Sequence, residues 1–184
     1  AIAGVVLMDG QIDHATGLFM LRERGTPLPL WCTDPVAQDL SEGNPVLRVL
    51  GHYCGVQRER IVPDGSSFAI PGVAGLSLRA FALASKAAPY SPHREAPVPG
   101  DNVGMLITNT ATGRSAFYAP GLGEITPALF DIMCSADAVL VGGSAVPPRL
   151  RRRAERARIR VVASYGMSES AGGCVYDGRA LSCA

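Results

Sequence analysis

Two carboxylates, an amide and an imidazole lie close together near the start of the chain. The segment reads Asp9-Gly10-Gln11-Ile12-Asp13-His14. Asp13 and His14 are adjacent, and both carboxylates and neutral imidazoles bind first-row transition metals. The pattern indicates a metal site, to which Asp9 adds a second carboxylate. The alternative is structural, because an Asp before a helix commonly caps it and a Gly there marks a turn.

A strand and a helix must position this segment. Residues 2–8 are apolar and predict a buried strand, and the amphipathic spacing of residues 18–21 predicts a helix. In open α/β sheets, ligands bind at the carboxyl ends of the strands. We therefore expect the acidic loop at such an end, with Asp13 close to the first helical turn, where negative charge is favoured.

The rest of the chain predicts short strands and two further capped helices. Strands are expected at residues 58–62, 67–70, 76–81, 103–108, 115–118 and 138–141, the first three as a meander and the next two as a hairpin. Helices are expected after Thr33 or Asp34 and after Thr126, where a Pro follows in the first turn. The Pro-rich stretch 85–100 is either a functional lid or a solvated loop.

Composition limits the class of protein. The chain has 184 residues, of which 47% are hydrophobic and 18% charged, as in a soluble globular domain. No apolar run reaches bilayer length, so membrane insertion is not expected. The five scattered Cys indicate neither a disulfide framework nor a zinc knuckle, and we expect free thiols in the cytoplasm. Nucleic acid is not an expected partner, because aromatic platforms are missing beside the Arg-rich segment near the C-terminus.

Several segments, in order, resemble one family over about residues 1–137. They are MDGQIDHATGLFMLRE, WCTDPVAQDLSEGNPVLRVL, APYSPHREAPVPGDNVGMLI and FYAPGLGEITPALFDIM. They resemble the pyrroloquinoline quinone (PQQ) biosynthesis protein B family, which has a metallo-β-lactamase-like fold. The resemblance implies an α/β protein with a partial αββα sandwich. The superfamily motif is H-x-H-x-D-H, and here Asp9 and Gln11 replace its leading His residues. Gln is a poor zinc ligand, which argues against an ordinary dizinc hydrolase.

The resemblance implies a part in making PQQ. One proposed role is carriage of PQQ or its precursor, and another is iron-dependent hydroxylation of the tyrosine ring in a Glu-Tyr dipeptide. For the second role we expect Asp13 and His14 as catalytic metal ligands. We expect Asp9 as a ligand or an orienting carboxylate, and Asp101 as either a fourth ligand or a turn residue. The expected metal is Fe(II), with Zn as the alternative.

Two residues of the Pro-rich stretch are candidates for binding the precursor. His93 and Arg94 could meet a carboxylate of the small-molecule or dipeptide substrate, since Arg binds carboxylates in a bidentate manner. An inactive module and a homodimer both stay open as alternatives.

The segment 138–184 resembles a different family, the AMP-forming o-succinylbenzoate-CoA ligases. It contains a Gly-Gly-Ser loop, a basic helix and Tyr165-Gly166-Met167-Ser168-Glu169, and it predicts a βαβ-like unit. In the ligases, the residues matching Tyr165, Ser168 and Glu169 hold the adenylate and Mg²⁺. The alternative function is therefore an ATP- or AMP-binding fragment, although the phosphate loop and the catalytic lid of the ligases are missing. The sequence thus predicts two regions, 1–137 and 138–184, joined near residue 138.

Overall fold

The computed structural model describes residues 2–142, together with 152, 155–156, 161–167, 172–176 and 179–180. The elements in chain order are β1 (Val5–Val6), α1 (Ile12–Ala15), the 3-10 helix η1 (Thr16–Leu21), β2 (Leu28–Cys32), α2 (Asp34–Gln38), the π-helical turn η2 (Asp39–Gly43), α3 (Val46–Leu50), β3 (Val56–Arg60), β4 (Asp64–Phe68), β5 (Leu76–Ala82), β6 (Val103–Asn109), β7 (Ser115–Ala119), α4 (Pro127–Ser135), β8 (Ala138–Val141), β9 (Val161–Met167), β10 (Gly172–Tyr176) and β11 (Arg179–Ala180).

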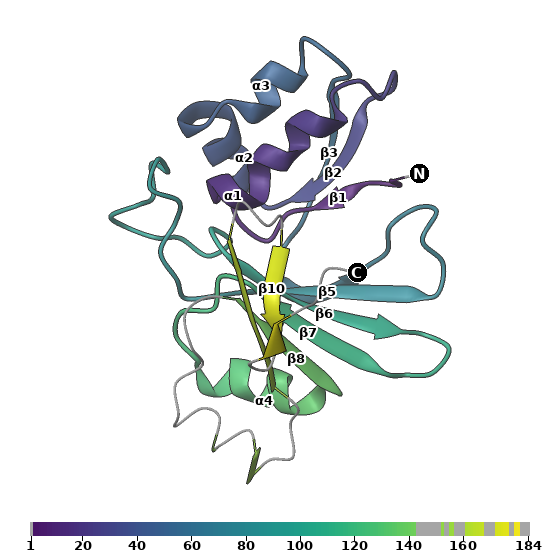
Figure 1. The fold of residues 1–184 in the computed structure, drawn as a ribbon, viewed down its shortest axis with the longest axis vertical. Coiled ribbons are helices and arrows are strands. Elements are labelled where there is room, and N and C mark those ends of the chain that lie inside the picture. The colour runs from purple at the N-terminus through teal and green to yellow at the C-terminus, as the bar shows by residue number, and fades with distance from the viewer. Residues whose placement is uncertain are drawn as a thin grey trace.

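Two sheets form the framework. The first has the order β1-β2-β3, all parallel, and the second has the order β11-β10-β9-β8-β7-β6-β5-β4. Helices α1 to α3 lie on one side of the first sheet, and α4 lies beyond the second sheet at the opposite end of the molecule (Figure 1). The predicted partial αββα sandwich is confirmed.

Alternation along single strands explains the layers. On β2, Leu28, Leu30 and Cys32 pack against the helices, whereas Trp31 belongs to the core between the sheets. On β6, Met105 faces that same inner core, whereas Leu106 packs with the core under α4. Successive side chains of a strand point to opposite faces, so each sheet separates two apolar layers.

Most of the predicted elements form, with shifted bounds. The 103–109 and 115–119 strands pair as the predicted hairpin, with Gly113 at φ 71° in its turn. The strand predicted over residues 2–8 narrows to Val5–Val6, and α1 already begins at Ile12. Asp13 and His14 therefore lie in the first helical turn, not in the loop before it.

The predicted meander is wrong in its first strand. Strand β3 pairs in parallel with β2, in the other sheet from β4 and β5. A parallel neighbour needs a crossover connection, and α2 and α3 provide it. A local pattern identifies a strand but not its pairing partner, and this limit explains the error.

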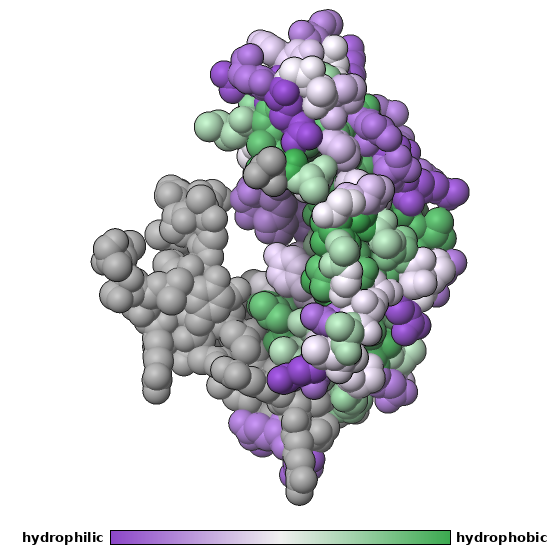
Figure 2. Space-filling model, turned by 90° about the vertical axis from the view of Figure 1, so that its right-hand side faces the viewer, coloured by the Kyte–Doolittle hydropathy of each residue, from purple (hydrophilic) through white to green (hydrophobic). Residues whose placement is uncertain are grey.

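Hydrophilic and hydrophobic residues separate on the surface. On the face that Figure 2 shows, hydrophilic residues cover the upper part of the molecule, and hydrophobic residues gather toward its middle. In the described part of the chain, no helix is long and apolar enough to cross a membrane.

The Thr33 side chain makes two hydrogen bonds, and removal of its hydroxyl is expected to destabilise the fold. Its Oγ1 accepts from the Val36 N–H (3.4 Å) and donates to the buried Gly100 carbonyl (2.6 Å). Thr33→Ala should lower the free energy of unfolding by about 1 kcal/mol through loss of the cap. The unpaired Gly100 carbonyl should lower it by a further ~1–3 kcal/mol. Urea unfolding of the variant measures this loss.

Thr126 offers a matched control, because it caps α4 by accepting from Leu129 N (3.2 Å). Thr126→Ala should lose only the cap, which lowers the free energy of unfolding by about 1 kcal/mol. Equal losses in the two variants would contradict the role assigned to the Gly100 bond.

Candidate metal centre

The site begins where the two sheets meet. Strand β1 ends near Leu7, whose N–H donates to the Trp31 carbonyl (2.9 Å), and Asp9 then forms a β-bridge with Asn102. Val103, which follows Asn102, starts β6 and donates its N–H to the Met8 carbonyl (2.8 Å). Asp9 is thus fixed between the first sheet and the second, and only 1% of it is exposed.

Asp9 orients His14. One carboxylate oxygen, Oδ1, lies 2.8 Å from His14 Nδ1 and also accepts the Gln11 N–H at 3.0 Å. Because a carboxylate only accepts hydrogen bonds, Nδ1 carries the proton and Nε2 of the neutral ring keeps a lone pair. The hydrogen bond that His14 Nδ1 donates to Asp9 is the main cause that raises the pKa of His14, and burial opposes it.

Asp13 lies beside the free side of the imidazole. Its Oδ2 is 3.9 Å from His14 Nε2, and both side chains are partly exposed. Two potential metal donors therefore stand next to each other on the first turn of α1. Of the two roles predicted for Asp9, this geometry matches the orienting carboxylate, because its Oδ1 is already bonded to the ring.

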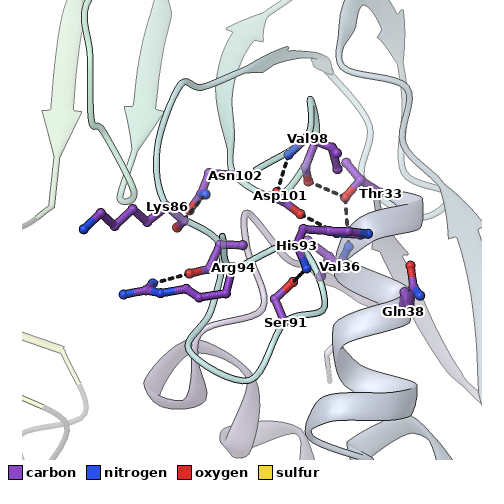
Figure 3. A network of polar contacts seen from close by, with 12 residues as sticks. Thr33, Val36, Gln38, Lys86, Ser91, His93, Arg94, Val98, Asp101 and Asn102 are labelled. Atoms are coloured by element: carbon purple, nitrogen blue, oxygen red, sulfur yellow. Dashed lines mark hydrogen bonds and ion pairs between the residues drawn. The ribbon is translucent and has the colours of Figure 1, made fainter. Parts of the chain in front are cut away.

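Asp101 is engaged elsewhere. Its Oδ1 lies 3.0 Å from His93 Nδ1, and its Oδ2 accepts the Val98 N–H at 2.6 Å (Figure 3). Within the described ranges, no three His, Cys, Asp or Glu side chains are grouped so that they could hold a metal ion. The structure therefore does not bring the four predicted ligands to one point.

His93 and Arg94 are held by their own loop. An N–H of the Arg94 guanidinium donates to the Ala87 carbonyl (2.5 Å), and the His93 backbone N–H donates to Ser91 Oγ (3.1 Å). Figure 3 shows both side chains on this loop, with His93 lying toward the helix that begins after Thr33. Binding of a substrate carboxylate by the pair stays a prediction.

Two further residues at the site escaped sequence reasoning. The Tyr90 hydroxyl donates to the Gly10 carbonyl, which joins the long loop to the acidic segment. Burial raises the pKa of Tyr90. Asp39, in η2, is fully buried, and a Cβ on Gly10 would lie 3.0 Å from its Oδ2. An Asp in a short predicted helix gave no signal of burial.

Asp39 is expected to destabilise the protein at neutral pH. Both of its carboxylate oxygens are buried without a hydrogen-bond partner among the described residues. Burial raises the pKa of Asp39, and the nearby Ser91 hydroxyl opposes that rise. A raised folded-state pKa favours the protonated form, so stability is full below the unfolded pKa and falls as the pH rises through the folded one.

Asp39→Asn removes the charge and should raise the free energy of unfolding by about 1 kcal/mol at pH 8. The gain should shrink toward pH 4, and urea unfolding at the two pH values measures it. Asp131→Asn, an exposed change on α4, is the control and should alter neither value. A gain that is equal at both pH values would contradict the buried-charge explanation.

Of the three ligase-like residues, the structure describes one. Tyr165 lies in β9, which pairs in parallel with β8, as a βαβ-like unit requires. Ser168 and Glu169 lie outside the described residues. The nucleotide site stays a prediction.

Comparison with known proteins identifies relatives. The family described as "Beta-lactamase superfamily domain" matches residues 1–169 and so extends past the join predicted near residue 138. The chain is 55% identical over 144 residues to coenzyme PQQ synthesis protein B of Azoarcus sp. (strain BH72), and 52% identical over 143 residues to that of Methylococcus capsulatus. Each match covers 78% of this chain and 47% of the relative. The chain thus spans about half the length of the curated relatives it matches.

Solved structures agree with the fold. The Zn²⁺-bound PqqB of Methylobacterium extorquens superposes with a TM-score of 0.65 at 27% identity, over 84% of this chain and 49% of that one. Human tRNase Z, short form, superposes with a TM-score of 0.57 at 15% identity, over 88% of this chain and 71% of that one, and shows the fold alone. The resemblance to the PQQ biosynthesis protein B family, predicted from the sequence, is confirmed.

Proposed function

This chain belongs to the family described as "Beta-lactamase superfamily domain", and from its similarity to coenzyme PQQ synthesis protein B we propose that it performs a metal-dependent step of PQQ biosynthesis. The proposed step is the hydroxylation of the tyrosine ring in a Glu-Tyr dipeptide precursor. Iron(II) with open coordination positions supplies the oxygen activation that ring hydroxylation needs.

One observation carries the proposal, the hydrogen bond between Asp9 and His14. A carboxylate on Nδ1 fixes the ring orientation and tautomer, which is the usual arrangement behind a metal-binding imidazole. It leaves Nε2 of His14 beside the Asp13 carboxylate, 3.9 Å away. His14 and Asp13 would hold the metal, and the remaining positions would be open to water, substrate or residues outside the described ranges.

The chain's own residues suit iron better than a pair of zinc ions. At α1 one imidazole and one adjacent carboxylate, those of His14 and Asp13, are partly exposed, and Gln11 stands where the superfamily motif has a second His. Two zinc ions need more nitrogen and sulfur donors than this set provides. A mixed nitrogen and oxygen set with open positions is typical of non-haem iron.

Metal content after anaerobic reconstitution with Fe(II) tests the proposal. We expect near-stoichiometric iron in the purified chain, and parallel loading with Zn²⁺ shows which ion is preferred. With dioxygen and a reductant, the loaded chain should add one oxygen atom to a Glu-Tyr dipeptide, as seen by mass spectrometry. A folded chain that retains neither iron nor zinc would refute the metal-dependent step and favour carriage of the precursor.

A further inference from the structure

Among the described residues, two buried aspartates each hold an imidazole through its Nδ1 atom. His14 Nδ1 lies 2.8 Å from Asp9 Oδ1, and His93 Nδ1 lies 3.0 Å from Asp101 Oδ1. In both pairs the carboxylate is buried, with 2% and 1% of its side chain exposed, while the imidazole reaches solvent, with 40% and 22% exposed. In each pair the carboxylate occupies Nδ1, so Nε2 is the ring nitrogen left for another partner.

Backbone contacts bring the two pairs close together. Asp9 is the bridge partner of Asn102, which directly follows Asp101. Bridge partners have Cα atoms about 4.5–5.5 Å apart and consecutive residues about 3.8 Å apart. The Cα atoms of Asp9 and Asp101 therefore lie within about 9 Å of each other. Tyr90, in the loop of His93, also donates to the Gly10 carbonyl.

The His93 pair is rigidly held. Its carboxylate also accepts the Val98 N–H at 2.6 Å, and the backbone N–H of His93 donates to Ser91 Oγ at 3.1 Å. The Gly100 carbonyl, just before Asp101, accepts from Thr33 at the start of α2 (Figure 3). A side chain whose supports are themselves bonded is pre-organised, as residues that act on a substrate need to be.

The second imidazole does not share an ion with the first. Within the described ranges no three donors converge on one point, so His93 is not placed as a third ligand beside Asp13 and His14. Asp101 occupies Nδ1 of His93, so Nε2 is the ring nitrogen that a substrate bound beside the metal site could reach. A second oriented imidazole near a metal site commonly transfers protons.

We propose that His93 is the general base of this site and accepts the phenolic proton of the tyrosine-bearing substrate, an inference that rests on the proposed function. The O–H bond of the phenol breaks, and its proton moves to Nε2. The Asp101 carboxylate, which accepts a hydrogen bond from Nδ1, stabilises the imidazolium that forms, as in other carboxylate–imidazole pairs. The phenolate left behind is a more electron-rich ring. This role differs from the carboxylate binding that the sequence predicted for His93 and Arg94.

The first test uses the iron-loaded full chain. His93→Gln and Asp101→Asn should retain the iron content of the unmodified chain and lose kcat on a Glu-Tyr dipeptide by about 10²–10⁴-fold, with KM little changed. Added imidazole should restore part of the activity of His93→Ala. His52→Gln, which changes an exposed His in the turn after α3, is the control and should leave kcat unaltered.

The second test needs neither iron nor turnover. A Glu-nitrotyrosine dipeptide has a phenolate that absorbs visible light, so its ionised fraction can be read directly on binding. The metal-free chain should bind the probe with a larger phenolate fraction than His93→Gln does at the same pH. Equal fractions, or no binding of the probe, would overturn the role of His93 whatever the metal result.

The two proposals fail in different ways. Normal iron content and dipeptide hydroxylation, with His93→Gln as active as the unmodified chain, would overturn the base while the proposed function stands. Absence of iron and of hydroxylation in the unmodified chain would overturn the proposed function, and the nitrotyrosine test would still decide whether His93 takes a phenolic proton.

Discussion

His14→Ala is expected to abolish stoichiometric metal binding, whereas His52→Ala should leave it unchanged. His14 has the one imidazole whose Nε2 stands beside the Asp13 carboxylate, and its other nitrogen is held by buried Asp9. Losing the imidazole leaves a carboxylate without a neighbouring nitrogen donor. The two substitutions are matched, since each removes one partly or fully exposed imidazole. Metal analysis after anaerobic loading with Fe(II) and desalting measures the difference.

Asp9→Asn separates orientation from ligation. The amide can present its NH₂ group to Nδ1, so the ring can take the other tautomer, with its proton on Nε2. Loss of such a supporting carboxylate typically lowers metal affinity by about 10–100-fold, less than the loss of the ligand itself. Asp13→Asn should weaken binding as a direct change of ligand. If Asp9→Asn were as damaging as His14→Ala, then Asp9 would be a ligand, the other role that the sequence allowed.

Phe117→Ala is expected to cause the largest loss of stability, about 3–5 kcal/mol. Phe117 is fully buried under α4, and its ring lies 6.4 Å from that of Phe81, tilted by 56°. Truncation opens a cavity in the core that joins the second sheet to α4. The free energy of unfolding of a single domain is only about 5–15 kcal/mol, so the variant should unfold at a much lower urea concentration.

Gly104 provides an independent test of the same packing. An added Cβ would lie 2.3 Å from the Cζ atom of the Phe117 ring, which is fully buried. Gly104→Ala should lower the free energy of unfolding by about 1–3 kcal/mol, because the added methyl group overpacks the core. The cost should fall when Phe117→Leu is also present, because the two side chains are in contact. Phe68→Ala, a partly buried ring on the edge strand β4, is the control and should cost less than Phe117→Ala.

The sequence alone determined the elements whose signals are local. Helices begin after Thr33 and Thr126 as predicted, because a cap needs only a side-chain oxygen and an N–H three residues later. Of the two predicted cap candidates, Thr33 and Asp34, it is Thr33 that caps α2. The hairpin of β6 and β7 was equally readable, since its turn joins neighbouring strands. The motif around Asp13 and His14, with its resemblance to one family, also pointed to the αββα fold.

The tertiary structure alone decided which distant residues meet. The parallel pairing of β3 with β2 depends on the path of α2 and α3, which no strand pattern contains. The hydrogen bond from Tyr90 to the Gly10 carbonyl and the bridge between Asp9 and Asn102 likewise join segments that lie far apart in the sequence. Burial of Asp39 depends on the same packing. Contacts between segments far apart in sequence arise only when the sheets pack, and the order of residue types along the chain does not encode them locally.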